Sequence, residues 1–154
     1  MDMKLIIAPK LRYLITRLLI GLVLLSNLEC ATVFLTHPQQ YNQAYELTGL
    51  PGEAAIRGFA ILFFMWNIPY VFALIQPANN FLSLIEANLM QLTGLIGESW
   101  LITQIPMQHS LLRSSITRFI IFDGIGLLIL FIAAMFIIPL KKQMIQNNSN
   151  KSNK

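Results

Sequence analysis

The feature that most constrains this sequence is the apolar stretch RFIIFDGIGLLILFIAAMFIIPL at residues 118–140. After its first residue it carries a single charge, that of Asp123, until the pair Lys141 and Lys142. As an α-helix, residues 119–140 would be about 33 Å long, just over the thickness of a bilayer's hydrocarbon core. The stretch therefore predicts a transmembrane helix, and we expect the other helices to pack beside it.

The composition favours the same class of protein. Hydrophobic residues make up 55% of the 154 residues, and charged residues make up 12%. That charged share is about half of the share in a typical soluble protein, too small to cover the surface of a soluble domain. The chain is also short for a soluble domain beside a membrane domain. We expect an integral membrane protein.

Hydropathy and turn signals divide the chain into predicted membrane spans. The expected spans are about residues 13–35, 58–75, 81–105 and 119–140. A polar connection, HPQQYNQAYELTGLPGEAAIR, separates the first two, and the polar tail at 141–154 is expected to be disordered. The predicted fold class is all-α, an integral membrane antiparallel four-helix bundle.

The positions of the positive charges predict the orientation of these spans. Of the 11 lysines and arginines, all but Arg57, Arg113 and Arg118 lie before the apolar run that starts at Leu18 or after the last span. The positive-inside rule then places both termini in the cytoplasm, in a multi-pass protein of the cell inner (plasma) membrane. The same rule explains the net charge of +4, so we expect no nucleic-acid partner.

Several kinds of site are absent from the sequence. Cys30 is the only cysteine, which excludes a CxxC pair, an intrachain disulfide and a cysteine-rich metal site. His37 and His109 lack the spacing of metal ligands, so we predict neither a metal nor a cofactor. No catalytic motif is present, and no catalytic residue is assigned.

Polar groups within or beside the spans define the candidate binding site. Its residues are Glu29, Arg57, Asn67, Glu98, Arg118 and Asp123. The three acids fall about 7–11 Å below the outer boundary of the predicted membrane domain, near the two arginines. Asn67 lies near the middle of the second span, beside Pro69, which should kink that helix.

Two interpretations of this cluster follow from the cost of a charge in a membrane. A membrane carboxylate is unfavourable by roughly 2.5–3.5 kcal/mol on insertion scales, so we expect pairing with arginine or protonation. In one interpretation the groups form a buried ion-pair and hydrogen-bond network that fixes helix register. In the other they line an outward-facing pocket for a headgroup, a quinone or a small substrate.

The layout resembles the DoxX-like group of small bacterial membrane proteins. The resemblance lies in the span count, the connection HPQQYNQAYELTGLPG and a second span containing Gly, Trp and Pro. It covers most of the chain and implies a four-helix membrane bundle that is either an accessory subunit of a membrane oxidoreductase or a protein of unknown role. No functional residue is transferred from that group.

Three functions remain open from the sequence. We expect first a non-catalytic binding or accessory protein whose polar cluster meets a lipid, a quinone or a partner protein, including a second copy of the chain. The alternative is a small membrane enzyme that uses Glu29, Glu98 or Asp123 as acid or base. The third is a transport component that moves protons or a small solute along Glu86, Gln91 and Glu98.

Overall fold

The computed structural model describes residues 8–152, without the side chains of residues 144–145 and 147–152. All regular structure in this part of the chain is helical, which confirms the predicted all-α class. The elements are α1 (Pro9–Thr36), α2 (Gln39–Asn42), the 3-10 helix η1 (Gln43–Tyr45), α3 (Gly49–Trp66), α4 (Ile68–Ile75), α5 (Phe81–Gln104) and α6 (Ser110–Ser152).

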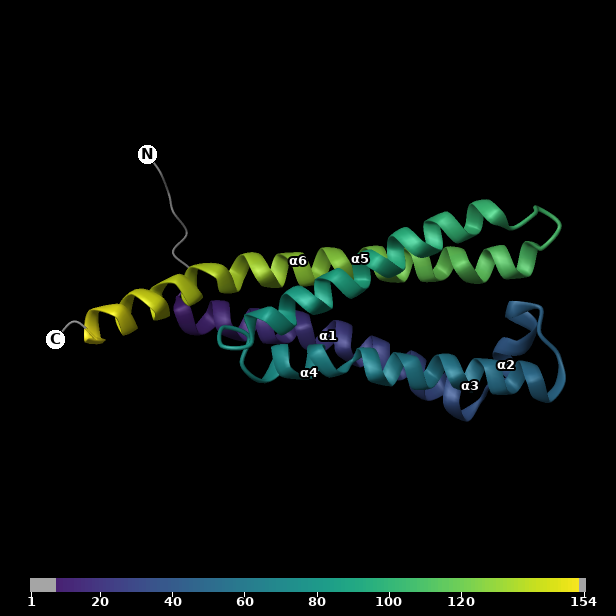
Figure 1. Cartoon of the computed structure of the whole chain (residues 1–154), viewed down its shortest axis with the longest axis horizontal. Coiled ribbons are helices and arrows are strands. Elements are labelled where there is room, and N and C mark those ends of the chain that lie inside the picture. Colours follow the sequence, from purple (N-terminus) through teal and green to yellow (C-terminus); the bar gives the residue numbers. More distant parts are fainter. Residues whose placement is uncertain (1–7, 153–154) are drawn as a thin grey trace.

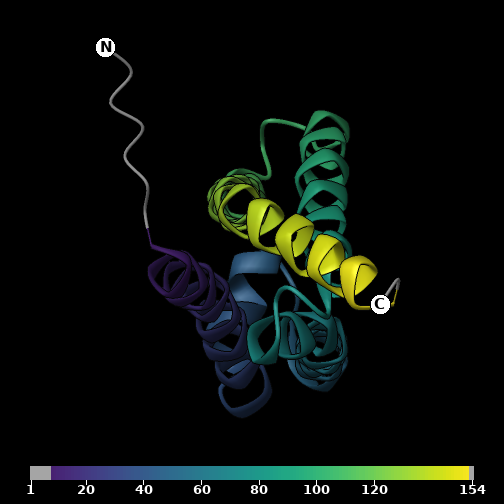
Figure 2. The same ribbon diagram turned by 90° about the vertical axis from the view of Figure 1, so that its left-hand side faces the viewer.

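The long helices lie lengthwise beside one another (Figure 1). Helix α1 packs against α3, α4 and α6, and α5 packs against α4 and α6. Figure 2 shows α6 beside both α1 and α5. Helices α3 and α5 diverge from the α4–α5 turn toward the end of the molecule that holds α2 (Figure 1). The cavity described below is lined by residues of both helices.

Three helical segments are long and apolar enough to cross a membrane. They are Pro9–Thr36, Gly49–Ile75, which combines α3 and α4, and Ser110–Gln143. These segments indicate a multi-pass membrane protein. Among the described residues α5 is not one of these candidate spans, because acidic side chains such as Glu86 and Glu98 lower its mean hydropathy. A fourth span at α5 stays a prediction.

The helix boundaries differ from the expected ones at two places. Helix α3 begins at Gly49, within the connection predicted to be polar, because Pro51 lies in its first turn, where proline is favourable. Helix α6 continues to Ser152, whereas the sequence predicts disorder from residue 141. Residues 141–152 contain neither glycine nor proline, so nothing in this segment ends the helix.

Asn67 separates α3 from α4, as the position of Pro69 predicts. Proline has no N–H, so the helical hydrogen-bond ladder is interrupted at this point. The Asn67 N–H donates to the carbonyls of Phe63 and Phe64, each at 3.2 Å. Its side-chain Nδ2 also donates to the Phe63 carbonyl, at 2.6 Å. Asn67 thus satisfies carbonyls in the last turn of α3, at the boundary between α3 and α4.

Two buried clusters hold the helices together. The larger cluster joins α1, α4, α5 and α6 and includes Ile20, Tyr70, Leu84 and Leu130. The smaller cluster is centred on Phe34 and lies toward the α2 end of the molecule. Many large apolar side chains outside these clusters are exposed on the surface, as expected for helices that contact lipid.

Candidate functional site

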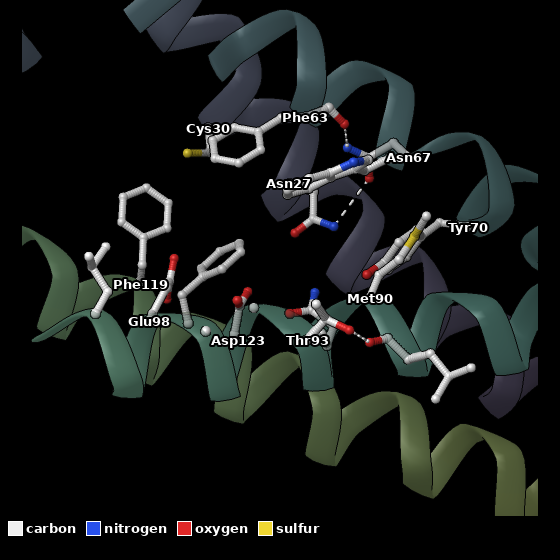
Figure 3. Close-up of a pocket in the computed structure, with 17 residues that line it drawn as sticks. Asn27, Cys30, Phe63, Asn67, Tyr70, Met90, Thr93, Glu98, Phe119 and Asp123 are labelled. Atoms are coloured by element: carbon white, nitrogen blue, oxygen red, sulfur yellow. Dashed lines mark hydrogen bonds between the residues drawn. The ribbon is translucent and has the colours of Figure 1, made fainter. Parts of the chain in front are cut away.

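A cavity of about 520 Å³ lies between α1, α3, α4, α5 and α6 (Figure 3). Its volume is typical of small-molecule sites, which span about 300–1,000 Å³. One wall comes from α1 and α3, which contribute Asn27, Cys30 and Phe63 (Figure 3). The opposite wall comes from α5 and α6, from which Glu98 and Asp123 point toward the space.

Most of the cavity surface is apolar and much of it is aromatic. The apolar lining residues are Phe63, Trp66, Leu89, Met90, Leu101, Phe119 and Phe122. Phe63 and Phe119 also contact Phe34, with ring centroids 5.8 and 6.0 Å apart. The smaller buried cluster therefore closes the cavity at the end near α2.

Two asparagines form a hydrogen-bonded chain on one wall. Asn27 Nδ2 on α1 donates to Asn67 Oδ1, at 3.2 Å, and Asn67 Nδ2 donates to the Phe63 carbonyl. Asn67 is only 3% exposed, so this chain fixes the break between α3 and α4 against α1. Tyr70, one turn farther along α4, donates its hydroxyl to the Ala87 carbonyl on α5 at 3.2 Å.

The opposite wall is built from polar side chains that face glycines. A Cβ at Gly94 on α5 would overlap the carboxylate of Asp123 on α6. A Cβ at Gly126 on α6 would come within 2.9 Å of the side chain of Gln91 on α5. On each helix the polar residue comes three positions before the glycine. Because the helices contact each other in opposite directions, the polar residue of one helix lies against the glycine of the other. This arrangement lets two polar side chains lie inside a close helix–helix contact.

Two acceptor atoms at this wall have no hydrogen-bond partner in the part of the chain that the structure describes. They are Gln91 Oε1 and Glu98 Oε2, and both atoms are buried. Gln91 as a whole is only 4% exposed. Buried polar atoms in folded proteins are nearly always hydrogen-bonded to protein or to water, so these two acceptors would be satisfied by donors held beside the cavity.

The charge of the lining is one-sided. Glu98 and Asp123 line the cavity, and among the residues that the structure describes no lysine, arginine or histidine lines it. The ion pairs among the described residues are Arg57 with Glu53, at 3.3 Å, and His109 with Glu46. The expected network of membrane acids and arginines is therefore not formed. Helical geometry explains this, because Arg57 reaches the residue four positions earlier on its own helix.

The six candidate binding residues separate into two groups. Asn67, Glu98 and Asp123 line the cavity, and the structure brings them together around one space. Glu29, Arg57 and Arg118 lie outside its lining. Glu29 and Arg118 are exposed on the surfaces of α1 and α6. The predicted transport path is divided in the same way, because Gln91 lines the cavity while Glu86 is exposed outside it.

Sequence reasoning missed Asn27 and the aromatic wall as site residues, and it placed Gln91 on a transport path and not in the binding site. A signal for part of the site is present in α5, where Gln91, Gly94 and Glu98 recur at helical spacing and share one face. The same spacing relates Asn27 to Cys30 on α1. Glu29 was predicted to belong to the site because of its depth in the membrane. Its direction around the axis of α1 differs from that of Asn27 and Cys30, so it lies outside the cavity lining.

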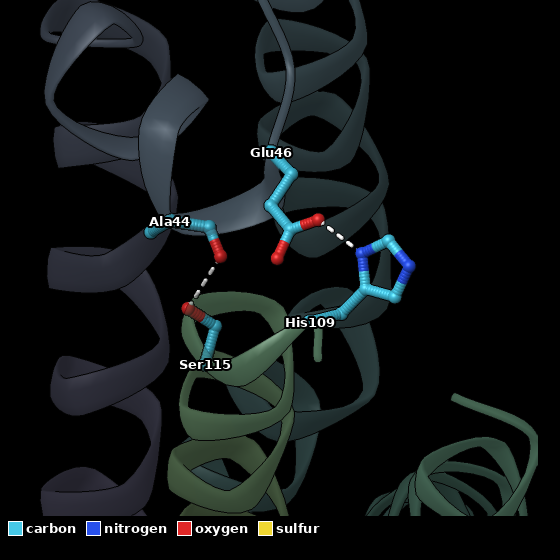
Figure 4. A network of polar contacts seen from close by, with 4 residues as sticks. All are labelled: Ala44, Glu46, His109 and Ser115. Carbon is cyan, nitrogen blue, oxygen red and sulfur yellow. Dashed lines mark hydrogen bonds and ion pairs between the residues drawn. The ribbon is translucent and has the colours of Figure 1, made fainter. Parts of the chain in front are cut away.

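A second polar contact joins the α2–η1 segment to the start of α6 (Figure 4). His109 Nδ1 lies 2.5 Å from Glu46 Oε2, and Ser115 Oγ donates to the Ala44 carbonyl at 2.8 Å. Tyr45, which lies between Ala44 and Glu46 in the sequence, packs on Phe119. Burial raises the pKa of the Tyr45 phenol. This end of the molecule is therefore closed by both aromatic and polar contacts.

The described residues include no group of three or more His, Cys, Asp or Glu side chains that could hold a metal ion. Comparisons with protein-family models, with curated proteins and with solved structures find no match to this chain.

Proposed function

We propose that this protein is a non-catalytic binding protein of the cell inner (plasma) membrane that holds a small amphipathic molecule in the cavity between α1, α3 and α5. One observation carries the proposal: an aromatic wall and unpartnered buried acceptors line the same space of about 520 Å³. Sites for small molecules combine a mainly apolar lining with a few polar groups that fix orientation. An amphipathic occupant matches both parts of this lining.

The proposal includes a topology of four crossings with both termini in the cytoplasm. Helix α5 has 24 residues, so it is about 36 Å long, enough to cross a bilayer. It packs against α6. Its polar residues Gln91 and Glu98 face the cavity, where a membrane helix tolerates polar groups. The start of α1 and the end of α6 lie at the same end of the molecule (Figure 1).

A role as an accessory subunit remains part of the proposal, in line with the resemblance to the DoxX-like group. The partner is then a second membrane protein or a second copy of this chain. An acid–base enzyme is the second candidate, because Glu98 and Asp123 line one cavity. Paired carboxyl groups can act as general acid and base when their environments differ.

Cys30 offers a direct test of binding, because it is the only cysteine and it lines the cavity. The protein is placed in phosphatidylcholine nanodiscs, and the rate at which a small membrane-permeant thiol reagent modifies Cys30 is followed by mass spectrometry. The probes are dodecanol, dodecylammonium, dodecanoate and a short-chain ubiquinone. We expect at least one probe to slow the modification in a saturable way.

Two glycines supply a matched pair of variants for this test. A Cβ at Gly97 or at Gly58 would meet nothing within 4 Å, but only Gly97 lines the cavity. Gly97→Phe should fill the space and abolish protection by the probes, whereas Gly58→Phe should preserve it. Protection that survives Gly97→Phe, or that also occurs at the exposed position of a Cys30→Ser/Gln40→Cys variant, would contradict the proposal.

A further inference from the structure

Building on the proposed function, we infer that the occupant is a cationic amphiphile, a lipophilic amine whose ammonium group lies between Glu98 and Asp123 and whose apolar part lies on the aromatic wall. Three properties of the cavity lining favour such an occupant: its charge, its hydrogen-bonding groups and its aromatic rings. Each of these properties discriminates among ammonium, alcohol, carboxylate and quinone headgroups.

The charge of the lining favours a cation. Glu98 and Asp123 are the carboxylic acids of the cavity wall, and no basic side chain in the described part of the chain lines it. The nearby arginines are engaged or turned away: Arg113 Nη1 donates to the carbonyls of Ile102 and Ile105, and Arg118 is exposed. An ammonium group would compensate carboxylates that are otherwise unfavourable in a membrane interior, and a carboxylate or phosphate would be repelled.

The unpartnered atoms also favour a donor-rich headgroup. Gln91 Oε1 and Glu98 Oε2 are both acceptors, so each needs an N–H or O–H group. Gln91 is only 4% exposed, so its amide has little contact with bulk solvent. A primary ammonium has three donors and no acceptor, an alcohol has one donor, and a quinone has acceptors alone. The ammonium matches the wall best.

The aromatic rings supply the remaining contacts. Phe119 lies between Phe63 and Phe122, with centroid distances of 6.0 and 6.4 Å. Phe119 stands beside Glu98 in the cavity (Figure 3). Cations are attracted to the faces of aromatic rings, and the strength of this attraction increases where water is excluded. The rings that hold the apolar part of the occupant thus also stabilise its charged end.

The test compares the concentrations at which probes of equal chain length protect Cys30 in phosphatidylcholine nanodiscs. We expect dodecylammonium to protect at a concentration at least about tenfold lower than dodecanol, as one charge-assisted hydrogen bond would produce. Dodecanoate should protect least. Glu98→Gln and Asp123→Asn should each weaken protection by dodecylammonium about tenfold and weaken protection by dodecanol less.

Glu86→Gln is the matched control, because Glu86 is an exposed acid on the same helix as Glu98 and does not line the cavity. It should leave protection by every probe unchanged. If dodecanol or the ubiquinone protects Cys30 at a lower concentration than dodecylammonium, the cation inference is wrong, while the cavity still binds an amphiphile. If the wild-type protein is protected by none of the probes, the proposed function fails as well.

Discussion

The carboxylate of Asp123 on α6 lies directly over Gly94 on α5, where any β-carbon would overlap it. The reverse pair, Gln91 over Gly126, lies beside it in the same helix contact. Asp123 and Gln91 both line the cavity. The glycines therefore do more than bring two helices together, because they determine where the polar groups of the site lie.

Gly94→Ala should destabilise the protein by about 1–3 kcal/mol, because the new methyl group has to displace the Asp123 carboxylate or separate the helices. Gly97→Ala, three positions later on the same helix, meets open space and should be neutral or stabilising by up to about 1 kcal/mol. The free energy of unfolding is measured in mixed micelles. Equal effects of the two substitutions would show that Gly94 and Asp123 are not in close contact.

Tyr70→Phe should lower the free energy of unfolding by about 0.5–1.5 kcal/mol, because it removes a buried hydrogen bond between α4 and α5. Tyr70 is 2% exposed, and its hydroxyl lies 3.2 Å from the Ala87 carbonyl. Tyr13→Phe is the control, since the Tyr13 hydroxyl makes a longer, exposed contact of 3.5 Å with the Ile75 carbonyl. A Tyr13→Phe loss as large as that of Tyr70→Phe would argue against the α4–α5 contact.

Glu46 and His109 should show a coupling energy of about 0.2–1 kcal/mol in a double-mutant cycle with Glu46→Gln and His109→Gln. The value is small because the two side chains are 32% and 41% exposed. A parallel cycle pairs His109→Gln with Glu53→Gln, whose carboxylate binds Arg57 instead, and should give no coupling. Coupling of the same size in both cycles would mean that His109 has no specific partner in the α2–η1 segment.

The proposed topology of four crossings makes a prediction about labelling in intact cells. In a Cys30→Ser background, a single cysteine at Gln40 should react with a membrane-impermeant thiol reagent from outside. Cysteines at Lys10, Asn79 and Lys142 should react only after the membrane is opened. If α5 did not cross, α6 would end on the outer side, and the cysteine at Lys142 would be labelled in intact cells.

Much of the architecture was predictable because apolar length and helix breakers are local properties of the sequence. Pro69 predicted the break at Asn67, and the turn at residues 76–80 correctly separated α4 from α5. The pair Glu53 and Arg57 was predictable from its spacing of four. The extension of α6 was missed because a polar segment without breakers is ambiguous between helix and disorder.

The site was only partly predictable because a helix position has a depth and also a direction. Glu29 and Cys30 are neighbours in sequence, yet Cys30 lines the cavity and Glu29 faces outward. Successive residues of an α-helix point in directions about 100° apart, so adjacent side chains have different surroundings. The directions of the other helices, which complete the cavity, depend on tertiary packing such as the match of Gly94 with Asp123.

The divergence of α3 from α5 has a consequence for how an occupant arrives. The lining residues Trp66, Leu89 and Leu101 are 50%, 54% and 42% exposed, so the cavity has an open rim along the apolar flank of the molecule. The end near α2 is closed by Phe34 and its neighbours. A ligand would thus enter sideways from the bilayer after partitioning into it. Occupancy would follow the ligand's mole fraction among the lipids, and a weak site would fill readily with a strongly partitioning amphiphile.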